Sequence, residues 1–130
     1  METNLNKISH AVIGASIDVH RELGPGLLES VYRKCLARVL RDEGYQVEEE
    51  VYLNLTFRGE VVEERAFRID LLVNDLVIVE VKSVETMKPL FSKQTLTYLK
   101  QTNKQLGLLI NFNVSVLKEG INRIVNHFEE

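Results

Sequence analysis

The chain has 130 residues, of which 45% are hydrophobic and 27% are charged, with only 2 prolines. This composition supplies the core of a single domain and excludes a disordered or low-complexity chain. The net charge of −3 argues against a protein that binds nucleic acid through its overall charge alone.

Two amphipathic helices are predicted in the first third of the chain. Apolar residues between Ile8 and Val19 recur at three-to-four spacing, which predicts a helix over residues 6–23 that ends at Gly24-Pro25-Gly26. A broader apolar stripe predicts the next helix over residues 27–43. The apolar face of the first helix is also a surface through which a homodimer or a partner protein could bind.

A hairpin of alternating apolar residues follows. It predicts strands over residues 51–57 and 61–73, joined by a short turn. The second of these strands places four apolar residues on one face: Phe67, Ile69, Leu71 and Val73. Asn74-Asp75 is a turn signal, so the next strand, residues 76–84, is expected to pair back with it.

The rest of the chain returns to helical spacing and then to an apolar run. A helix is predicted over residues 90–103 after Pro89, and a buried strand over residues 105–112. Residues 120–128 fit either a short helix or an edge strand. The order ααβββαβ plus a short C-terminal element predicts an α/β (α+β) domain, in which helices flank a mixed sheet.

Nothing in the sequence suggests a membrane protein. No apolar run approaches the roughly 20 residues that cross a bilayer, and the first ten residues lack the pattern of a signal peptide. The single cysteine, Cys35, rules out an internal disulfide framework. A cytoplasmic location is therefore expected.

Charged residues interrupt two of the apolar strands. Glu80 and Lys82 lie in the run VIVEVKS on the same face, where they could simply form a structural ion pair. That explanation omits Asp70, which interrupts FRIDLLV and should lie beside Glu80 across a tight turn. Two close carboxylates repel unless one holds a proton or a cation sits between them. Hard oxygen ligands of this kind suit Mg²⁺ or Mn²⁺.

The spacing of these charges resembles a known motif. Asp70, nine intervening residues and Glu80-Val81-Lys82 resemble Asp-x(n)-Glu-x-Lys of the PD-(D/E)XK nuclease-like superfamily. Gln94 and Tyr98, one helical turn apart, resemble the Gln-xxx-Tyr element of its exonuclease-like branches. One departure is Ile69, which stands where the motif has proline.

A second motif narrows the resemblance. Gly26, Glu29 and Tyr32 match Gly-x-x-Glu-x-x-Tyr, which names a small bacterial and archaeal family, the GxxExxY proteins. The resemblance covers about residues 24–126, preceded by the helix of residues 1–23, and we interpret the whole chain as one domain. It implies a restriction-endonuclease-like core.

The resemblance also implies roles for individual residues. It implies four ligands for Mg²⁺ or Mn²⁺: Asp70, Glu80, Glu29 (directly or through water) and the backbone carbonyl of Val81. Lys82 would orient or deprotonate the attacking water, or stabilise the developing charge on the phosphate. Gln94 would orient water or the scissile phosphate, and Tyr98 would pack against or contact the nucleic-acid backbone.

Several of these residues have simpler explanations. A glutamate in the first turn of a helix, such as Glu29, is favourable with the helix dipole. Tyr32 lies on the apolar stripe and is expected to belong to the core. Gln94 and Tyr98 fit an ordinary polar helix face equally well. Arg68, two residues before Asp70, is either a phosphate contact or a neutralising partner for the acidic cluster.

The segment after VIVEVKS is rich in lysine. Residues 81–104 carry five lysines against a single glutamate, among them Lys88 and Lys93. These lysines are either a local positive surface for nucleic acid or ordinary solvated side chains.

Taken together, these features predict a metal-dependent nuclease that acts on DNA or RNA. The first alternative is a catalytically silent module on the same fold, which binds nucleic acid or protein. The second is a structural ion-pair cluster in a small scaffold protein.

Overall fold

The computed structural model describes residues 4–127, and apolar periodicity sets its helices. They are α1 (Asn4–Leu23), α2 (Glu29–Asp42), α3 (Pro89–Thr102) and a short 3₁₀ helix, η1 (Leu117–Gly120). Proline lies in the first turn of α3, where its missing N–H has no partner to lose. No helix in the described part of the chain is long and apolar enough to cross a membrane.

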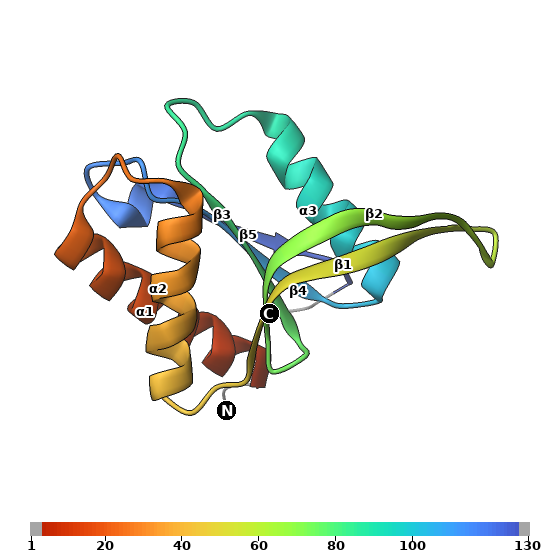
Figure 1. The fold of residues 1–130 in the computed structure, drawn as a ribbon, viewed down its shortest axis with the longest axis horizontal. Coiled ribbons are helices and arrows are strands. Elements are labelled where there is room, and N and C mark those ends of the chain that lie inside the picture. The colour runs from red at the N-terminus through yellow and green to blue at the C-terminus, as the bar shows by residue number, and fades with distance from the viewer. Residues whose placement is uncertain (1–3, 128–130) are drawn as a thin grey trace.

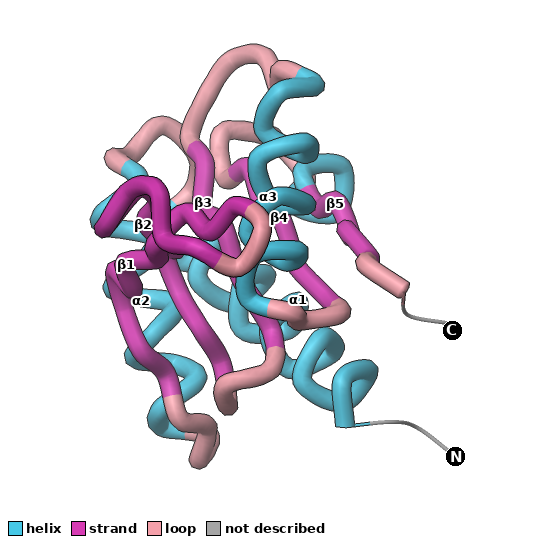
Figure 2. Tube along the Cα trace, turned by 90° about the vertical axis from the view of Figure 1, so that its right-hand side faces the viewer, coloured by secondary structure: helices cyan, strands magenta, loops and turns pink. Residues whose placement is uncertain are grey.

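Within the described residues, five strands form one mixed sheet in the order β1-β2-β3-β4-β5. Their bounds are β1 (Val47–Phe57), β2 (Glu60–Val73), β3 (Val77–Lys82), β4 (Leu106–Asn111) and β5 (Ile121–Val125). Of these strands, β3 and β4 are the pair that runs in parallel, and α3 connects them. The element order and the mixed, strongly twisted sheet (Figure 2) confirm the predicted fold class.

Helices cover both faces of the sheet (Figure 1). α1 and α2 pack on one face over the larger apolar cluster, which includes Val12, Leu36 and Val79. α3 packs on the other face over a smaller cluster: Ile69, Leu72, Ile78 and Leu99. The central strands β3 and β4 are therefore buried on both faces, so any charge that they carry lies inside the protein.

The apolar face of α1 belongs to this core. Ile8, Val12, Ala15 and Val19 are at most 4% exposed and pack with α2 and the sheet. The expectation that this face is free for a homodimer or partner is wrong, because the sheet already covers it.

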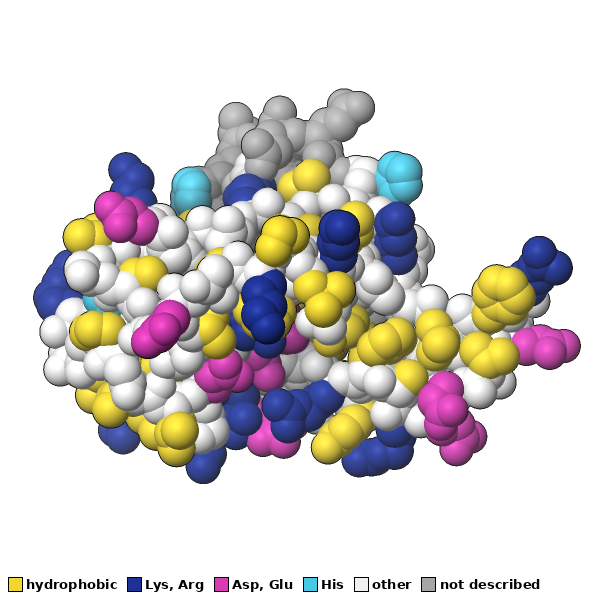
Figure 3. Space-filling model, turned by 90° about the horizontal axis from the view of Figure 1, so that it is seen from above, with side chains coloured by type: hydrophobic (Ala, Val, Ile, Leu, Met, Phe, Trp, Pro, Cys, Tyr) yellow, Lys and Arg dark blue, Asp and Glu magenta, His cyan; other side chains and the backbone are white. Residues whose placement is uncertain are grey.

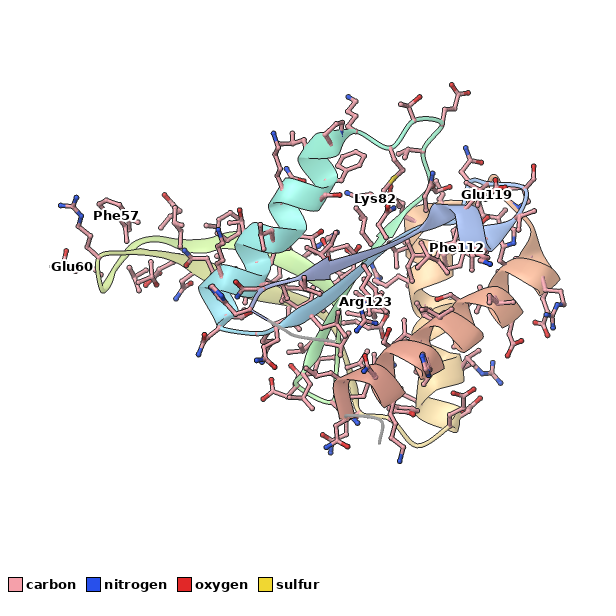
Figure 4. The ribbon with its side chains drawn as sticks, turned by 180° about the vertical axis from the view of Figure 1, so that it is seen from behind. Phe57, Glu60, Lys82, Phe112, Glu119 and Arg123 are labelled. Carbon is pink, nitrogen blue, oxygen red and sulfur yellow. The ribbon has the colours of Figure 1, made fainter. Side chains whose placement is uncertain are left out.

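Several of the exposed apolar side chains lie together on a two-stranded arm. The far parts of β1 and β2 extend beyond the rest of the sheet, with Phe57 and Glu60 paired at the tip (Figures 1 and 4). Figure 3 shows apolar side chains following the arm towards its tip. Four large apolar residues of the arm are at least 46% exposed: Tyr52, Phe57, Val61 and Val62.

The alternation expected for β2 breaks at Asp70. The prediction that Ile69 shares a face with Leu71 is wrong, since Ile69 packs in the α3 cluster and Leu71 in the cluster under α1 and α2. The register puts Glu50 of β1 opposite Asp70, and Glu50 has a left-handed backbone with φ of 52°. A regular pleat is interrupted at this point of both strands, which redirects the side chains on either side of Asp70.

The C-terminal element is a strand. Of the two predicted alternatives for residues 120–128, the edge strand is correct over Ile121–Val125, which pairs antiparallel with β4. Phe128, at the end of the predicted element, lies outside the described residues.

Candidate active site

Two carboxylates replace backbone hydrogen bonds where β2 and β3 separate. The paired ladder ends at Leu71 and Val79. Beyond it, the Asp70 N–H donates to Glu80 Oε2 at 2.7 Å, and the Val81 N–H donates to Asp70 Oδ2 at 2.8 Å. We call this reciprocal arrangement of Asp70 and Glu80 the carboxylate clasp. It brings together the two acidic residues that were expected to meet across the hairpin.

The turn that closes the hairpin explains why they meet. Asn74 and Asp75 both have left-handed backbones, with φ of 52° and 55°, and the Leu76 N–H donates to the Val73 carbonyl at 3.0 Å. This is a type I′ turn, whose twist matches that of the two strands. The turn fixes the register that carries Asp70 to Glu80.

Burial raises the pKa of both carboxyl groups in the clasp. Glu80 is 6% exposed, and burial together with the neighbouring Asp70 charge raises its pKa to about 8. The pKa of Asp70 is also raised, chiefly by burial, although the Val81 N–H and the Arg68 and Lys82 charges oppose this. The clasp therefore favours a bound proton or a bound cation, since either reduces the repulsion between the two groups.

Lys82 lies beside the clasp at the end of β3, facing α3 (Figure 4). Its Nζ is 4.4 Å from the centroid of the Phe91 ring, a cation–π contact that holds the ammonium in place. Within the described residues Lys82 forms no ion pair with Glu80 shorter than 4 Å, so the two are not a simple structural pair. The sequence analysis missed Phe91, although it lies three residues before Gln94 on the same helical face.

The other predicted site residues in and before α3 differ in how far they are buried. Tyr98 is half-buried, with its ring 5.4 Å from that of Phe67, and burial followed by the Glu80 and Asp70 charges raises its pKa. Gln94 is exposed one turn earlier. Lys88, which caps the helix, and Lys93 are also exposed. Tyr98 is therefore close enough to the carboxylates for their charge to act on its hydroxyl. The two lysines face solvent at the start of α3.

Glu29 approaches the same end of β3 from the first turn of α2. Its Oε2 accepts a hydrogen bond from the Ser83 N–H at 3.2 Å, and Ser83 Oγ donates to the Leu27 carbonyl at 2.6 Å. The Glu29 charge contributes to the raised pKa of Asp70, so it lies within electrostatic reach of the clasp. The loop before α2 turns at Gly26, whose φ of 94° suits glycine.

Tyr32 fixes this loop from inside the core, as expected. Its ring stacks on Phe112 with centroids 4.5 Å apart, and its hydroxyl donates to the Gly24 carbonyl and accepts from the Leu27 N–H at 3.1 Å. The Gly-x-x-Glu-x-x-Tyr spacing therefore places a carboxylate at the site and, one turn later, a hydroxyl that holds the loop before it.

Replacing this tyrosine tests that link. Tyr32→Phe keeps the stacked ring but removes the hydroxyl that pairs with both the Gly24 carbonyl and the Leu27 N–H, so we expect a loss of about 1–2 kcal/mol in the free energy of unfolding. Urea denaturation measures it. Tyr52→Phe, on the exposed arm, is the matched control and should change stability by less than about 0.5 kcal/mol. Equal stability of the two variants would contradict the assigned role.

A cleft of about 660 Å³ opens beside the clasp, between α2 and the base of the arm. Six of its lining residues are charged: Glu29, Arg33, Lys34, Glu50, Arg68 and Asp70. Arg68 Nη2 lies 3.6 Å from Asp70 Oδ1, so the arginine partly neutralises the clasp. Arg33 and Glu50 were not predicted as site residues. For Glu50, the one available signal was its register position opposite Asp70.

The comparison with protein families agrees with this geometry. The family model described as the PD-(D/E)XK nuclease superfamily matches residues 6–124. The chain belongs to this superfamily. Neither the curated proteins nor the solved structures gave a significant match. PD-(D/E)XK nucleases generally use divalent metal ions.

The clasp of this PD-(D/E)XK protein fits a hard divalent ion. Mg²⁺ is usually held by one or two carboxylates, with water and substrate phosphate completing its octahedral shell. Asp70 and Glu80 supply two such carboxylates, next to the backbone of Val81. No three His, Cys, Asp or Glu side chains between residues 4 and 127 gather closely enough to bind an ion by themselves. The remaining ligands would be water, substrate or, through water, Glu29.

Proposed function

We propose that the protein is a Mg²⁺- or Mn²⁺-dependent nuclease of the GxxExxY type, which hydrolyses phosphodiester bonds in DNA or RNA. The observation that carries this proposal is the carboxylate clasp, in which the buried Glu80 and the partly buried Asp70 are joined through backbone N–H groups beside an ordered lysine, while Asp70 also lines an open cleft. The single free cysteine, Cys35, fits a cytoplasmic enzyme.

The residues of the clasp and its surroundings have distinct tasks in this proposal. Asp70 and Glu80 would hold the ion together with the Val81 carbonyl, and the ion would supply Lewis-acid chemistry toward the phosphate and a water molecule. Lys82 would orient the attacking water or help to deprotonate it, or would stabilise the negative charge that develops on the phosphate. Its ammonium is suited to this task because Phe91 restrains it without neutralising it.

The surrounding residues bind and orient the nucleic acid. Gln94 orients water or the scissile phosphate, and Tyr98 contacts the nucleic-acid backbone. Lys88 and Lys93 are exposed near the start of α3, where they attract phosphates by charge. Arg68 contributes a guanidinium that lines the cleft.

Lys82→Ala tests the proposal because it removes a catalytic group without removing a carboxylate. Purified wild type should cleave DNA or RNA in Mg²⁺ or Mn²⁺, and the variant should be slower by about 100-fold or more while still binding Mn²⁺. Lys100→Ala, an exposed lysine of α3 outside the cleft, is the control and should cleave at the wild-type rate. Cleavage by Lys82→Ala at the wild-type rate would refute the role of Lys82.

A second candidate is a catalytically silent module that binds nucleic acid or protein through the same cleft. It is favoured by one observation, that the described residues include no group of three protein ligands for an ion. This candidate predicts binding of a partner without dependence on divalent metal, and no cleavage by wild type of any DNA or RNA substrate.

A further inference from the structure

Four charged side chains that line the cleft form a chain of ion pairs between α2 and the base of the arm. Arg33 Nη2 lies 2.8 Å from Glu50 Oε1, and Arg68 Nη1 lies 3.5 Å from Glu50 Oε2. Arg68 Nη2 in turn lies 3.6 Å from Asp70 Oδ1. Glu50 therefore links a buried arginine of α2 to the arginine that faces the carboxylate clasp.

The backbone of Glu50 has an unusual conformation for its position. It lies within β1 and opposite Asp70, yet its φ is 52°. Glutamate rarely adopts this left-handed region, and the conformation has a free-energy cost. Strained residues of this kind concentrate at functional sites, where the surrounding structure maintains them. Here the conformation accompanies a side chain that lines the cleft.

The need to neutralise Arg33 does not by itself explain why a glutamate stands at position 50. Arg33 is 8% exposed and needs an acidic partner, but it already has a second one, because its Nε lies 3.4 Å from Glu49 Oε1. Glu49 is also paired with Arg41 at 3.1 Å. What distinguishes the two glutamates is Arg68, which is paired with Glu50 and not with Glu49.

We propose that Glu50 is a positioning residue, which holds the Arg68 guanidinium in the cleft so that it pairs with a backbone phosphate of bound nucleic acid. This inference deepens the proposed function and rests on it. The Arg68 side chain is 46% exposed, and its two ion pairs, at 3.5 and 3.6 Å, are long. Most of its five N–H donors therefore remain able to form the paired hydrogen bonds that phosphate accepts.

A metal ion at the site would make such a tether necessary. A divalent ion bound by Asp70 would compete with Arg68 for the same carboxylate and repel the guanidinium. Without Glu50, a long and flexible arginine would then swing into solvent. With Glu50 in place, Arg68 stays on the cleft wall within reach of the phosphate that lies against the ion.

The test is a double-mutant cycle read by equilibrium binding. The affinities of fluorescent DNA and RNA oligonucleotides are measured in Ca²⁺ for wild type, Arg68→Ala, Glu50→Gln, the double variant and the control Glu49→Gln. We expect Arg68→Ala to weaken binding by about tenfold and Glu50→Gln by about threefold to tenfold, as for the loss of one charged hydrogen bond. The double variant should be no weaker than Arg68→Ala, because Glu50 acts only through Arg68.

The direction of the effect separates this proposal from simple electrostatics. Removing a negative charge should strengthen binding to a polyanion, so Glu49→Gln should bind as well as wild type or slightly better. Glu50→Gln is predicted to do the opposite. Equal or tighter binding by Glu50→Gln, additive losses in the double variant, or no binding by wild type would each overturn the proposal.

Two further measurements keep the outcomes distinct. If Glu50→Gln folds poorly, Glu50→Asn replaces it, because asparagine tolerates the left-handed backbone, and the same loss of binding is expected. Cleavage by wild type is assayed in parallel with Mg²⁺ and Mn²⁺. If wild type binds through Arg68 and Glu50 but does not cleave, the nuclease proposal is refuted and this inference stands. If wild type cleaves but Glu50→Gln behaves like Glu49→Gln, this inference is refuted and the nuclease proposal stands.

Discussion

Asp70→Ala is expected to abolish both metal binding and nucleic-acid cleavage. Asp70 is one of the two carboxylates of the clasp, and its loss leaves Glu80 as a single, buried carboxyl ligand. Calorimetric titration with Mn²⁺ and Mg²⁺ should show saturable binding in wild type that is lost in the variant. Cleavage should fall by about 1,000-fold or more.

Asp70→Asn separates the charge of this residue from its hydrogen bond. The amide oxygen can still accept from the Val81 N–H, so the clasp keeps its shape while the repulsion with Glu80 disappears. We expect this variant to unfold at the same urea concentration as wild type or a higher one, and to bind no metal. Asp42→Asn, an exposed acidic residue at the end of α2, should change neither property. Full-rate cleavage by either Asp70 variant would rule out the assigned metal site.

The second large effect is a loss of stability as the pH rises towards 8. The pKa of Glu80 is about 8 in the folded protein, against an ordinary value of 4.5, so the folded state binds more protons between these values. The stabilising contribution is therefore complete below about pH 4.5 and is lost as the pH rises through about 8. Since one pKa unit corresponds to about 1.4 kcal/mol, the loss is on the order of 2–5 kcal/mol in the metal-free protein.

Urea denaturation with EDTA, at several pH values between about 5 and 9, measures this loss. Glu80→Gln is the matched variant, because the amide stays neutral at every pH and can still accept from the Asp70 N–H. As the pH rises, the free energy of unfolding of wild type should fall relative to that of the variant. A difference that stays constant over this range would show that Glu80 does not titrate there.

The affinity for metal should depend on pH in the opposite direction to the stability of the metal-free protein. A divalent ion binds the ionised carboxylates, so binding below about pH 8 must release a proton from the clasp. The apparent affinity for Mn²⁺ should rise with pH and level off above about 8. Titrations in two buffers of different ionisation enthalpy count the protons released, and a count of zero at neutral pH would contradict the raised pKa of Glu80.

Local sequence patterns predicted the central part of this site because its geometry is set by a hairpin. Asp70 and Glu80 lie at similar distances from Asn74-Asp75, and turn chemistry together with strand alternation is enough to bring them together. The same reasoning gave the order of helices and strands, since each has the apolar period of its type.

The residues that were missed depend on contacts between elements distant in the sequence. β1 begins at Val47 rather than at residue 51 because Arg33 and Arg41 of α2 pair with its acidic residues, and no local pattern contains that information. The break in alternation at Asp70 was missed for a related reason. It accompanies the left-handed backbone of Glu50, a residue type that gives no signal for this conformation.

The type I′ turn at Asn74-Asp75 also limits how the gene for this protein can vary. An insertion or deletion there that shifts the pairing of β2 and β3 by one residue would turn Asp70 and Glu80 to opposite faces of the sheet. The core would lose its apolar pattern in the same step. The turn at the tip of the arm, between Phe57 and Glu60, carries no such constraint, because neither the clasp nor the buried clusters depend on its length. Insertions and deletions should therefore be tolerated at the tip and eliminated by selection at Asn74-Asp75.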